Sequence, residues 1–197
     1  RTPPELFISG SAIGIYGRQT NTEIDESFTQ FNEEFTHVVC SKWENLALMA
    51  ESEKTRVAVL RTGIVLDKKA GALAKMLLPF KLGVGGKIGN GQQVMSWIHI
   101  EDMIAAIMHV VNEPSLRGPI NLTSKCPVTN KTFATVLART LNRPNLVTTP
   151  SFVMKLVFGE MADLLLYGQH VIPKKLTDSG FTFKYPEIDV ALSHLLR

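Results

Sequence analysis

The stretch LFISGSAIGIYG, residues 6–17, decides how the rest of the chain is interpreted. It begins as a short apolar run and closes in serines, glycines and other small residues. This pattern predicts a buried β-strand whose end delivers hydroxyl side chains. A second stretch, RVAVLRTGIVL at residues 56–66, is apolar and rich in β-branched residues, so it predicts a second buried strand.

Helical and strand patterns alternate around these two stretches. The predicted elements are a helix at 35–49, a helix at 71–83 that bends or ends near Pro79, a glycine-rich loop at 83–93, a short strand entering an amphipathic helix at 96–112, a strand at 118–124 and a helix that stops before Pro144. This alternation predicts an α/β domain with a mainly parallel sheet.

The pattern changes after residue 150. Residues 151–181 predict two or three short helices without alternating strands. Residues 185–197 predict a last helix, with Pro186 near its start. A second, helical part of the chain is therefore expected.

The composition argues against several classes of function. The 197 residues carry 21 basic and 18 acidic side chains, scattered rather than gathered in a basic stripe, so we expect no nucleic-acid partner. No apolar run approaches the roughly 20 residues of a membrane span, and the N-terminal RTPPEL lacks the apolar core of a signal peptide. Cys40 and Cys126 share no short spacing, which argues against a disulfide framework or a metal site. Two such thiols fit a reducing compartment, so a cytoplasmic protein is expected.

Ligands of parallel α/β sheets bind at the carboxyl ends of the strands. Two sets of residues are therefore expected on the ligand-facing edge: Ser9, Gly10 and Ser11 from the first strand, and Arg61, Thr62 and Gly63 from the second.

The chain contains no recognisable glycine motif for cradling phosphates. No strand is followed by G-x-G-x-x-G, and the glycines of residues 83–91 have the wrong spacing. Gly86 and Lys87 are followed by Ile88, whereas a P-loop requires Ser or Thr there.

Several motifs, in order along the chain, resemble one enzyme family. They are SGSAIGIYG (9–17), CSKWE (40–44), RVAVLRTGIVL (56–66), LPFKLGVGGKIGNGQQ (78–93), SWIHIEDM (96–103), GPINLTS (118–124) and GQHVIPKKLTDSGFTFKYPEI (168–188). Together they resemble the epimerase-type branch of the extended short-chain dehydrogenase/reductase superfamily. Within it, they are most similar to the NAD-dependent epimerase/dehydratase-like subfamily that carries its own C-terminal segment of unknown function.

The resemblance implies the C-terminal part of a Rossmann-type parallel sheet, with a smaller helical cap on the substrate side. Family members extend further at the N-terminus, so the chain resembles their C-terminal two-thirds, without the first strands and the glycine motif. We therefore expect residues 1–150 to form an incomplete Rossmann-type domain that includes a substrate-side loop at 79–97. Residues 151–197 are expected to form a helical, family-specific segment.

In this superfamily a Ser, a Tyr and a Lys carry the acid–base chemistry. The Ser-Ala-x-x-Tyr-Gly-type strand end matches Ser11 and Ala12 and, after one additional residue, Tyr16 and Gly17. Aligned on Glu44, the catalytic Tyr and Lys positions fall on Thr36 and Cys40. A threonine hydroxyl is a far weaker acid than a phenol with a pKa near 10, and a thiol cannot supply an ammonium group. The implied catalytic residues are thus Ser11, Thr36 and Cys40, with a degenerate Tyr–Lys pair.

Several of these residues also have a plainer interpretation. Ser11 suits a tight turn simply by being small, and Cys40 suits a buried apolar position as well as a reactive one. His37 is either a replacement base or an exposed helical histidine. His99, which shares a strand face with Trp97, is either catalytic or a core residue.

The resemblance also implies a cofactor site, because residues 61–65 match the strand end that approaches the nicotinamide in this superfamily. A plain core strand is the alternative. The implied cofactor-binding residues are Ser9, Gly10, Arg61, Thr62, Gly63, Ile64 and Val65. The implied cofactor is NAD or NADP, with NADP slightly favoured. Because the phosphate cradle is missing, we expect this chain alone not to bind it.

The expected function is that of an NAD(P)-dependent oxidoreductase or epimerase, similar to nucleotide-sugar epimerases but of unknown substrate. The alternative is a non-catalytic NAD(P)-binding regulatory protein that kept the fold and lost the acid–base pair. The expected partner is a small-molecule substrate such as a nucleotide sugar. An exposed sheet edge at the first strand would also favour a homo-oligomer.

Overall fold

Three parallel strands form the central sheet in a computed structural model that describes residues 2–19, 22–159 and 166–197. Their order is β1 (Leu6–Ala12), β3 (Arg56–Thr62) and β8 (Gly118–Leu122). The prediction of an α/β fold with a parallel sheet is confirmed.

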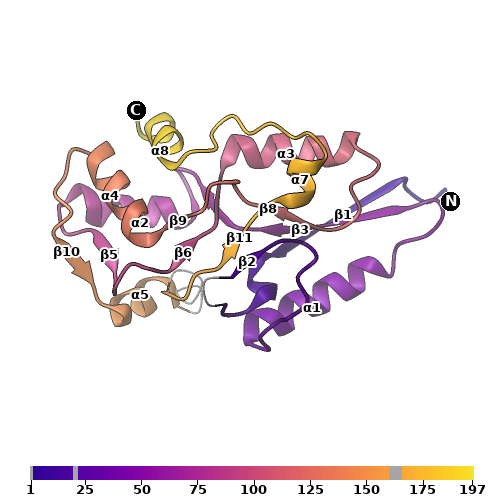
Figure 1. The fold of residues 1–197 in the computed structure, drawn as a ribbon, viewed down its shortest axis with the longest axis horizontal. Helices are drawn as coiled ribbons and strands as arrows, with labels where there is room; N and C mark the ends of the chain where they lie inside the picture. Colours follow the sequence, from indigo (N-terminus) through magenta and orange to yellow (C-terminus); the bar gives the residue numbers. More distant parts are fainter. Residues whose placement is uncertain (1, 20–21, 160–165) are drawn as a thin grey trace.

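Helices cover both faces of this sheet (Figure 1), with α3 (Ile100–Asn112) on one side and α1 (Phe35–Leu48) on the other. Successive residues of β3 alternate between the two faces. Val57 and Val59 pack with Ala47 of α1, whereas Ala58 and Leu60 pack in a cluster with α3 residues. The next residue, Arg61, therefore faces α1.

The chain leaves the central sheet through β4 (Ile64–Leu66), which pairs in parallel with β7 (Trp97–His99). A second group of elements follows, at the left of Figure 1. It consists of α2 (Gly71–Lys81), β5 (Gly86–Ile88), β6 (Val94–Met95), β9 (Val128–Thr129), α4 (Asn130–Thr140), β10 (Val147–Thr149) and α5 (Ser151–Phe158).

The glycine-rich segment is more ordered than the sequence predicts. Instead of a continuous loop, it contains β5, which pairs in parallel with β10. A Cβ atom at Gly86 would overlap the carbonyl oxygen of Val147, so only glycine permits this approach. Pro79 lies inside α2, and the helix runs two residues beyond it.

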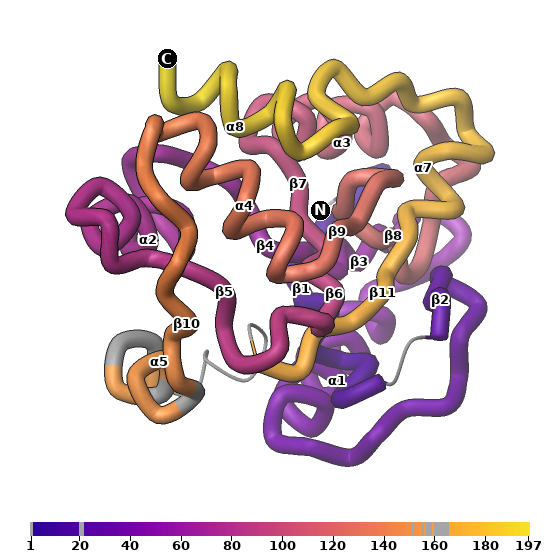
Figure 2. The backbone as a smooth tube through the Cα atoms, turned by 60° about the vertical axis from the view of Figure 1, so that its left-hand side comes forward, coloured from indigo at the N-terminus to yellow at the C-terminus, as the bar shows by residue number. Residues whose placement is uncertain are grey.

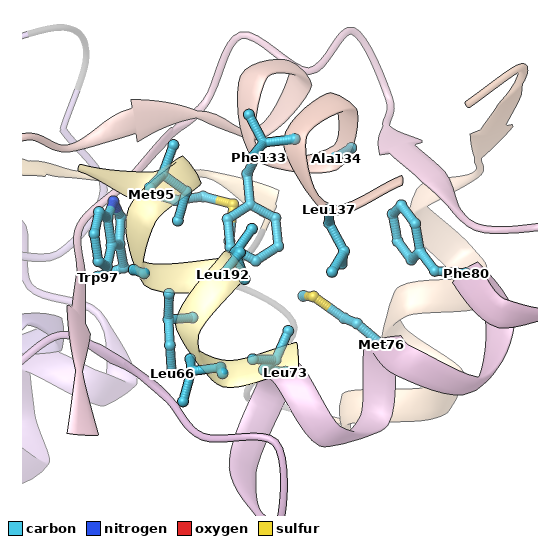
Figure 3. Close-up of a cluster of buried hydrophobic side chains, with 14 of the residues drawn as sticks. Leu66, Leu73, Met76, Phe80, Met95, Trp97, Phe133, Ala134, Leu137 and Leu192 are labelled. Atoms are coloured by element: carbon cyan, nitrogen blue, oxygen red, sulfur yellow. The ribbon is translucent and has the colours of Figure 1, made fainter. Parts of the chain in front are cut away.

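The largest apolar core joins the second group of elements to the C-terminal helix α8 (Ile188–Leu196) (Figure 3). Figure 2 shows α8 running along the same side of the molecule as α4, which it contacts. The central members of this core are Leu66, Leu73, Met76, Phe80, Met95, Trp97, Phe133, Leu137 and Leu192.

The C-terminal segment is helical only in part. It contains α5, α7 (Lys174–Asp178) and α8, but also the strand β11 (His170–Val171). This strand pairs in parallel with β2 (Glu23–Ile24). The prediction that residues 151–181 form helices without strands was therefore wrong at β11. Residues 160–165, which belong to the same predicted segment, lie outside the described residues. Among the described residues, no helix is long and apolar enough to cross a membrane.

A polar contact fastens the C-terminal segment to the start of α3. Asp102 is buried and accepts the backbone N–H groups of Lys184 at 2.8 Å and Tyr185 at 2.9 Å. The N-cap of α3 is His99, whose Nδ1 accepts the N–H of Glu101 at 3.0 Å, and Asp102 lies in the first turn.

His99 also contacts α8. Its side chain is fully buried, so its position is that of a core residue. Because its Nδ1 accepts a hydrogen bond, the neutral ring carries its proton on Nε2 and donates to Nδ1 of His194, 3.1 Å away. The ring of Tyr185 stacks on both imidazoles, at 4.1 and 4.4 Å between ring centres. The second nitrogen of His194 lies 3.7 Å from the carboxylate of Glu101, which also pairs with Lys184.

This arrangement predicts that acid weakens the fold. Burial, together with the charge of His194, lowers the pKa of His99 from its ordinary value of 6.5, against smaller opposing effects of Asp102 and Glu101. A depressed pKa contributes stability that is complete above the unfolded-state pKa and is lost as pH falls through the folded-state value. We expect the free energy of unfolding, measured with urea, to decrease between about pH 7 and about pH 5.

The variant His99→Asn keeps a helix-capping oxygen but does not titrate, so its stability should depend less on pH. The half-exposed His170 offers the control, and His170→Asn should retain the wild-type slope. Equal slopes for wild type and His99→Asn would contradict the assignment.

Candidate functional site

Three polar residues form a row across the central sheet near its carboxyl end. Ser11 of β1 lies opposite Arg61 of β3, and Arg61 lies opposite Asn121 of β8. Partner residues on neighbouring parallel strands project to the same face. All three are buried, with 9%, 5% and 0% of their surface exposed. The row therefore needs polar partners from the elements above it.

Glu44 of α1 supplies the first partner. Its carboxylate accepts Ser11 Oγ–H at 2.7 Å, Arg61 Nε–H at 2.9 Å and Arg61 Nη2–H at 2.8 Å. The two guanidinium contacts form a bidentate ion pair, the strongest geometry for such groups. Because Glu44 is itself only 4% exposed, both charges are largely removed from water.

Tyr16 supplies the second partner. The 3-10 turn η1 (Ile13–Tyr16) follows β1 directly and places the phenol over the row. Its hydroxyl donates to Asn121 Oδ1 at 2.8 Å and accepts Arg61 Nη1–H at 3.0 Å. Gly17 ends the turn at φ 65°, beside the backbone of Asn32, a position that favours glycine. We call Ser11, Tyr16, Glu44, Arg61 and Asn121 the polar cluster.

The surroundings shift the pKa values of two members of the cluster, Tyr16 and Arg61. Burial raises the pKa of Tyr16, although the nearby Arg61 opposes the shift, so the phenol stays protonated. Burial disfavours the charge of Arg61, but the interactions with Glu44 and Tyr16 together outweigh this effect and raise the pKa of the guanidinium. The cluster thus contains one carboxylate, one guanidinium and two neutral hydroxyls, paired with one another.

A further carboxylate, that of Glu26, links β8 to the C-terminal segment. Glu26 accepts the backbone N–H of Asn121 at 2.9 Å and that of Lys175 at 3.2 Å. Burial raises its pKa above the ordinary value. The Gln169 side chain donates to the carbonyl oxygen of Gly17 at 2.5 Å. The C-terminal segment is therefore connected to the end of β1 and to β8.

The three residues assigned catalytic roles occupy different surroundings. Ser11 lies in the polar cluster. Cys40 lies next to it, 3% exposed, and burial raises the pKa of its thiol. Thr36 lies one turn earlier on α1, where it contacts Gly14 and lines a small recess with Gly17 and Gln169.

The residues assigned to cofactor binding follow the strand ends. Ser9 and Gly10 precede Ser11 on β1, and open space surrounds the position of a Cβ at Gly10. Arg61 and Thr62 are the last residues of β3. The backbone N–H of Gly63 donates to the carbonyl oxygen of Leu122 at 3.1 Å. Ile64 and Val65 are half-buried and pair with β7. Only Arg61 of this set belongs to the polar cluster.

His37 is neither exposed nor free in this arrangement. It is half-buried, its Nδ1 lies 2.5 Å from Ile15 O, and its Nε2 lies 3.1 Å from Ser41 Oγ. Among the residues that the structure describes, no group of three or more His, Cys, Asp or Glu side chains could hold a metal ion.

Three members of the polar cluster, Tyr16, Glu44 and Asn121, were missed as site residues from the sequence, although Tyr16 had been matched to the Tyr-Gly pair. Glu44 follows Cys40 by four residues, so both lie on one face of α1, and that spacing was the available signal. Asn121 has no such signal, because its place depends on the strand register.

Comparisons with known proteins find one family model and several similar sequences. Residues 149–195 match a family described as a domain of unknown function (DUF1731). The chain is 42% identical over 191 residues to Epimerase family protein ML0860 of Mycobacterium leprae, covering 96% of this chain and 62% of that protein. The chain thus spans less than two-thirds of the length of this curated relative.

Solved structures share the fold. A crystal structure of the human epimerase family protein SDR39U1 (isoform 2) with NADPH is similar at a TM-score of 0.89 and 33% identity, covering 98% of this chain and 66% of that one. The nucleoside-diphosphate sugar epimerase of Corynebacterium glutamicum is similar at a TM-score of 0.79 and 28% identity, covering 98% and 37%. This chain therefore has a Rossmann-type fold, as its structural neighbours do.

Changes in the polar cluster should affect stability in a definite order. Glu44→Gln leaves Arg61 buried without its counter-charge, and we expect a loss of about 3–5 kcal/mol in the free energy of unfolding by urea. Ser11→Ala removes one hydrogen bond to the carboxylate and should cost about 1.5–3 kcal/mol. The paired variant Glu44→Leu/Arg61→Met removes both charges and should be less destabilised than Glu44→Gln. A Glu44→Gln protein as stable as wild type would contradict this order.

Cys40 should be chemically inert in the folded protein. Its buried, protonated thiol should resist iodoacetamide at about pH 8 and react only after unfolding in urea. The half-buried Cys126, whose pKa burial also raises, is the internal control for access. Mass spectrometry of the two cysteine peptides gives both rates. Faster alkylation of Cys40 than of Cys126 in the native state would instead indicate a reactive thiol.

Proposed function

We propose that this chain belongs to the epimerase family and forms the larger part of an NADP(H)-dependent oxidoreductase or epimerase. The observation that carries the proposal is the similarity to the human NADPH complex, at 33% identity over 98% of the chain. The reaction proposed for the whole protein is hydride transfer between the nicotinamide and a small molecule. A nucleotide sugar is the proposed substrate class, supported by the named activity of the Corynebacterium glutamicum protein.

The strand ends suit the nicotinamide half of the cofactor. Parallel α/β sheets bind ligands at this edge, and the open space beside Gly10 lets a ligand approach the backbone of β1. Ile64 and Val65 offer half-buried apolar side chains that a ring could pack against. The described residues include no glycine turn between strand and helix for the phosphates, so we propose that another part of the whole protein binds them.

The cofactor supplies the hydride chemistry, and the protein supplies position and proton transfer. The polar cluster holds β1, β3 and β8 in register, so it fixes the strand ends on which the cofactor residues lie. Thr36 and Cys40 offer neither a phenol nor an ammonium group at the expected positions. We therefore propose a reaction that does not proceed through a Tyr–Lys pair, with Ser11, Thr36 and Cys40 as the residues nearest to the reacting groups.

The second candidate is a non-catalytic NAD(P)-binding regulatory protein. The pairing of Ser11 with Glu44 favours it, because this hydroxyl donates its proton inside the polar cluster rather than toward a substrate. The raised pKa of Cys40 points the same way. Both observations concern proton transfer, and neither argues against cofactor binding.

The organisation of the whole protein follows from the same proposal. We propose that residues 1–150 form the Rossmann-type part, including a substrate-side loop at 79–97, and that residues 151–197 form a cap on the substrate side. The family match at residues 149–195 supports this boundary. The further proposals are a cytoplasmic location, because Cys40 and Cys126 are free thiols, and a homo-oligomer.

The test uses protein expressed from the complete reading frame that contains this chain. We expect calorimetry to show micromolar or tighter binding of NADPH, and absorbance of the nicotinamide to report its oxidation by members of a carbonyl and nucleotide-sugar panel. Ser11→Ala, checked for folding, should lower turnover more than NADPH affinity.

The two candidates give different results in this experiment. Tight NADPH binding without turnover of any panel member would favour the regulatory protein. Failure to bind either NADPH or NADH would overturn both.

A further inference from the structure

We propose that the lobe formed by α2, β5, β6, β9, α4, β10 and α5 docks on the surface of an anionic phospholipid bilayer. The contact is made by its tip, which consists of residues 78–84, residues 143–147 and α5. This inference goes beyond the proposed function, because it concerns a surface partner rather than a reaction. Residues 79–84 also belong to the segment proposed as the substrate-side loop, so membrane binding must be measured apart from cofactor binding.

The lobe carries basic residues and no acidic ones. Its two segments, residues 68–95 and 128–159, contain nine of the 21 basic residues of the chain and none of its 18 acidic residues. The basic residues are spread along both segments, so no stripe is visible in the sequence. The fold brings the segments together at the left of Figure 1, and they remain together in the rotated view of Figure 2. The lobe is therefore positive, although the formal net charge of the chain is only +3.

Large apolar side chains protrude from the tip of this lobe. Six of them are 56–89% exposed: Leu78, Leu82, Val84, Leu146, Phe152 and Leu156. Residues four apart lie on one face of a helix, so the two leucines of the α2 end share a face, as do the two side chains of α5. An exposed apolar patch rimmed by polar groups is typical of a surface that contacts another protein or a membrane.

The tip is one continuous surface. A Cβ atom at Gly83 would lie 3.8 Å from the ring of Pro144, so the loop after α2 lies against the loop after α4. The strands that follow these loops, β5 and β10, pair with each other. Val84 and Val153 line the same cavity, which places α5 beside the end of α2. The protruding side chains therefore gather at one end of the molecule.

Cationic side chains lie next to these apolar ones. Lys81 directly precedes Leu82, and Arg143 lies three residues before Leu146; both cations are exposed. Each Lys or Arg near an anionic membrane surface strengthens binding, while neighbouring apolar side chains enter the boundary between headgroups and acyl chains. The tip provides both kinds of group. Such docking needs no membrane-spanning helix.

The outer face of α1 shows why charge selects the tip. This face also exposes apolar side chains, including Leu46 at 69%. However, residues 33–34 and 51–53, which flank the helix, include four glutamates. An anionic membrane would repel these carboxylates, whereas the lobe has none of its own. The charge distribution therefore favours the tip over α1.

Two other partners fit the tip less well. A second copy docked tip to tip would bring like charges together. RNA phosphates would match the cations, but five of the six protruding side chains are aliphatic and offer no ring for bases to stack on. A bilayer with anionic headgroups matches both the charge and the aliphatic side chains.

The test is sedimentation of protein expressed from the complete reading frame with unilamellar vesicles. One set contains phosphatidylcholine alone, and the other is an equimolar mixture with phosphatidylserine. We expect the protein to bind the mixed vesicles about tenfold or more tightly than the neutral ones. This binding should weaken as NaCl rises from about 0.05 to about 0.5 M, because salt screens the headgroup charge.

Matched variants separate the apolar and the charged parts of the tip. Leu82 and Leu46 are both 69% exposed, so Leu82→Gln should weaken binding about tenfold or more, while Leu46→Gln should not change it. The double variant Lys81→Gln/Arg143→Gln should weaken binding to the mixed vesicles about tenfold. Lys42→Gln/Lys54→Gln changes the net charge equally at exposed sites outside the lobe and should have little effect. Thermal unfolding checks that each variant is folded.

A fluorescent side chain locates the contact. Phe152→Trp places an indole on α5, and its emission should shift to shorter wavelength with mixed vesicles and be quenched by brominated phosphatidylcholine in them. The wild type is the control, since Trp43 lies on α1 and Trp97 is buried.

Four results would overturn the proposal. They are equal or absent binding to the two kinds of vesicle; equal effects of Leu82→Gln and Leu46→Gln; tighter binding of a single-stranded RNA oligonucleotide than of mixed vesicles; and self-association that Leu82→Gln abolishes. The third result would assign the tip to nucleic acid and the fourth to a second copy. Calorimetry with NADPH on the same proteins tests the proposed function separately, because the tip variants should keep the wild-type NADPH affinity.

Discussion

The buried ion pair between Glu44 and Arg61 is the interaction on which the site depends. A charge removed from water is costly unless its donors and lone pairs all find partners. Arg61 gives two N–H groups to Glu44 and one to Tyr16, and Glu44 takes its remaining hydrogen bond from Ser11. This requirement explains why a hydroxyl stands at the end of β1 and why a phenol folds back over the sheet. It also sets the rotation of α1, because Glu44 must face Arg61.

Much of the fold follows from the sequence, and the site follows only in part. The apolar runs at 6–12 and 56–62 identify the two long strands because such runs are too short and too β-branched for buried helices. They also place Ser11 and Arg61 on one edge. That these two face each other, with Asn121 beside them, depends on a strand register that no local pattern encodes.

Two of the short strands, β5 and β11, were missed for a related reason. β5 and β11 have three and two residues, and tertiary contacts rather than local propensity stabilise elements so short. β5 exists because Gly86 lets β10 approach, and β11 exists because β2 lies beside it. The glycine-rich composition of residues 83–93 predicted a loop, and the sequence pattern of residues 151–181 predicted helices. In both cases a partner strand far along the chain determined the outcome.

The polar cluster also has a kinetic consequence. Two of its members, Tyr16 and Asn121, are 105 residues apart in the sequence. Contacts of such separation form only after long loops have closed, and proteins rich in them fold slowly. We infer that the Arg61 guanidinium keeps its hydration until β1, β3 and β8 have aligned, so its dehydration comes late. Interactions formed after the transition state slow unfolding without accelerating folding. The cluster therefore sets the lifetime of the native state more than the time needed to reach it.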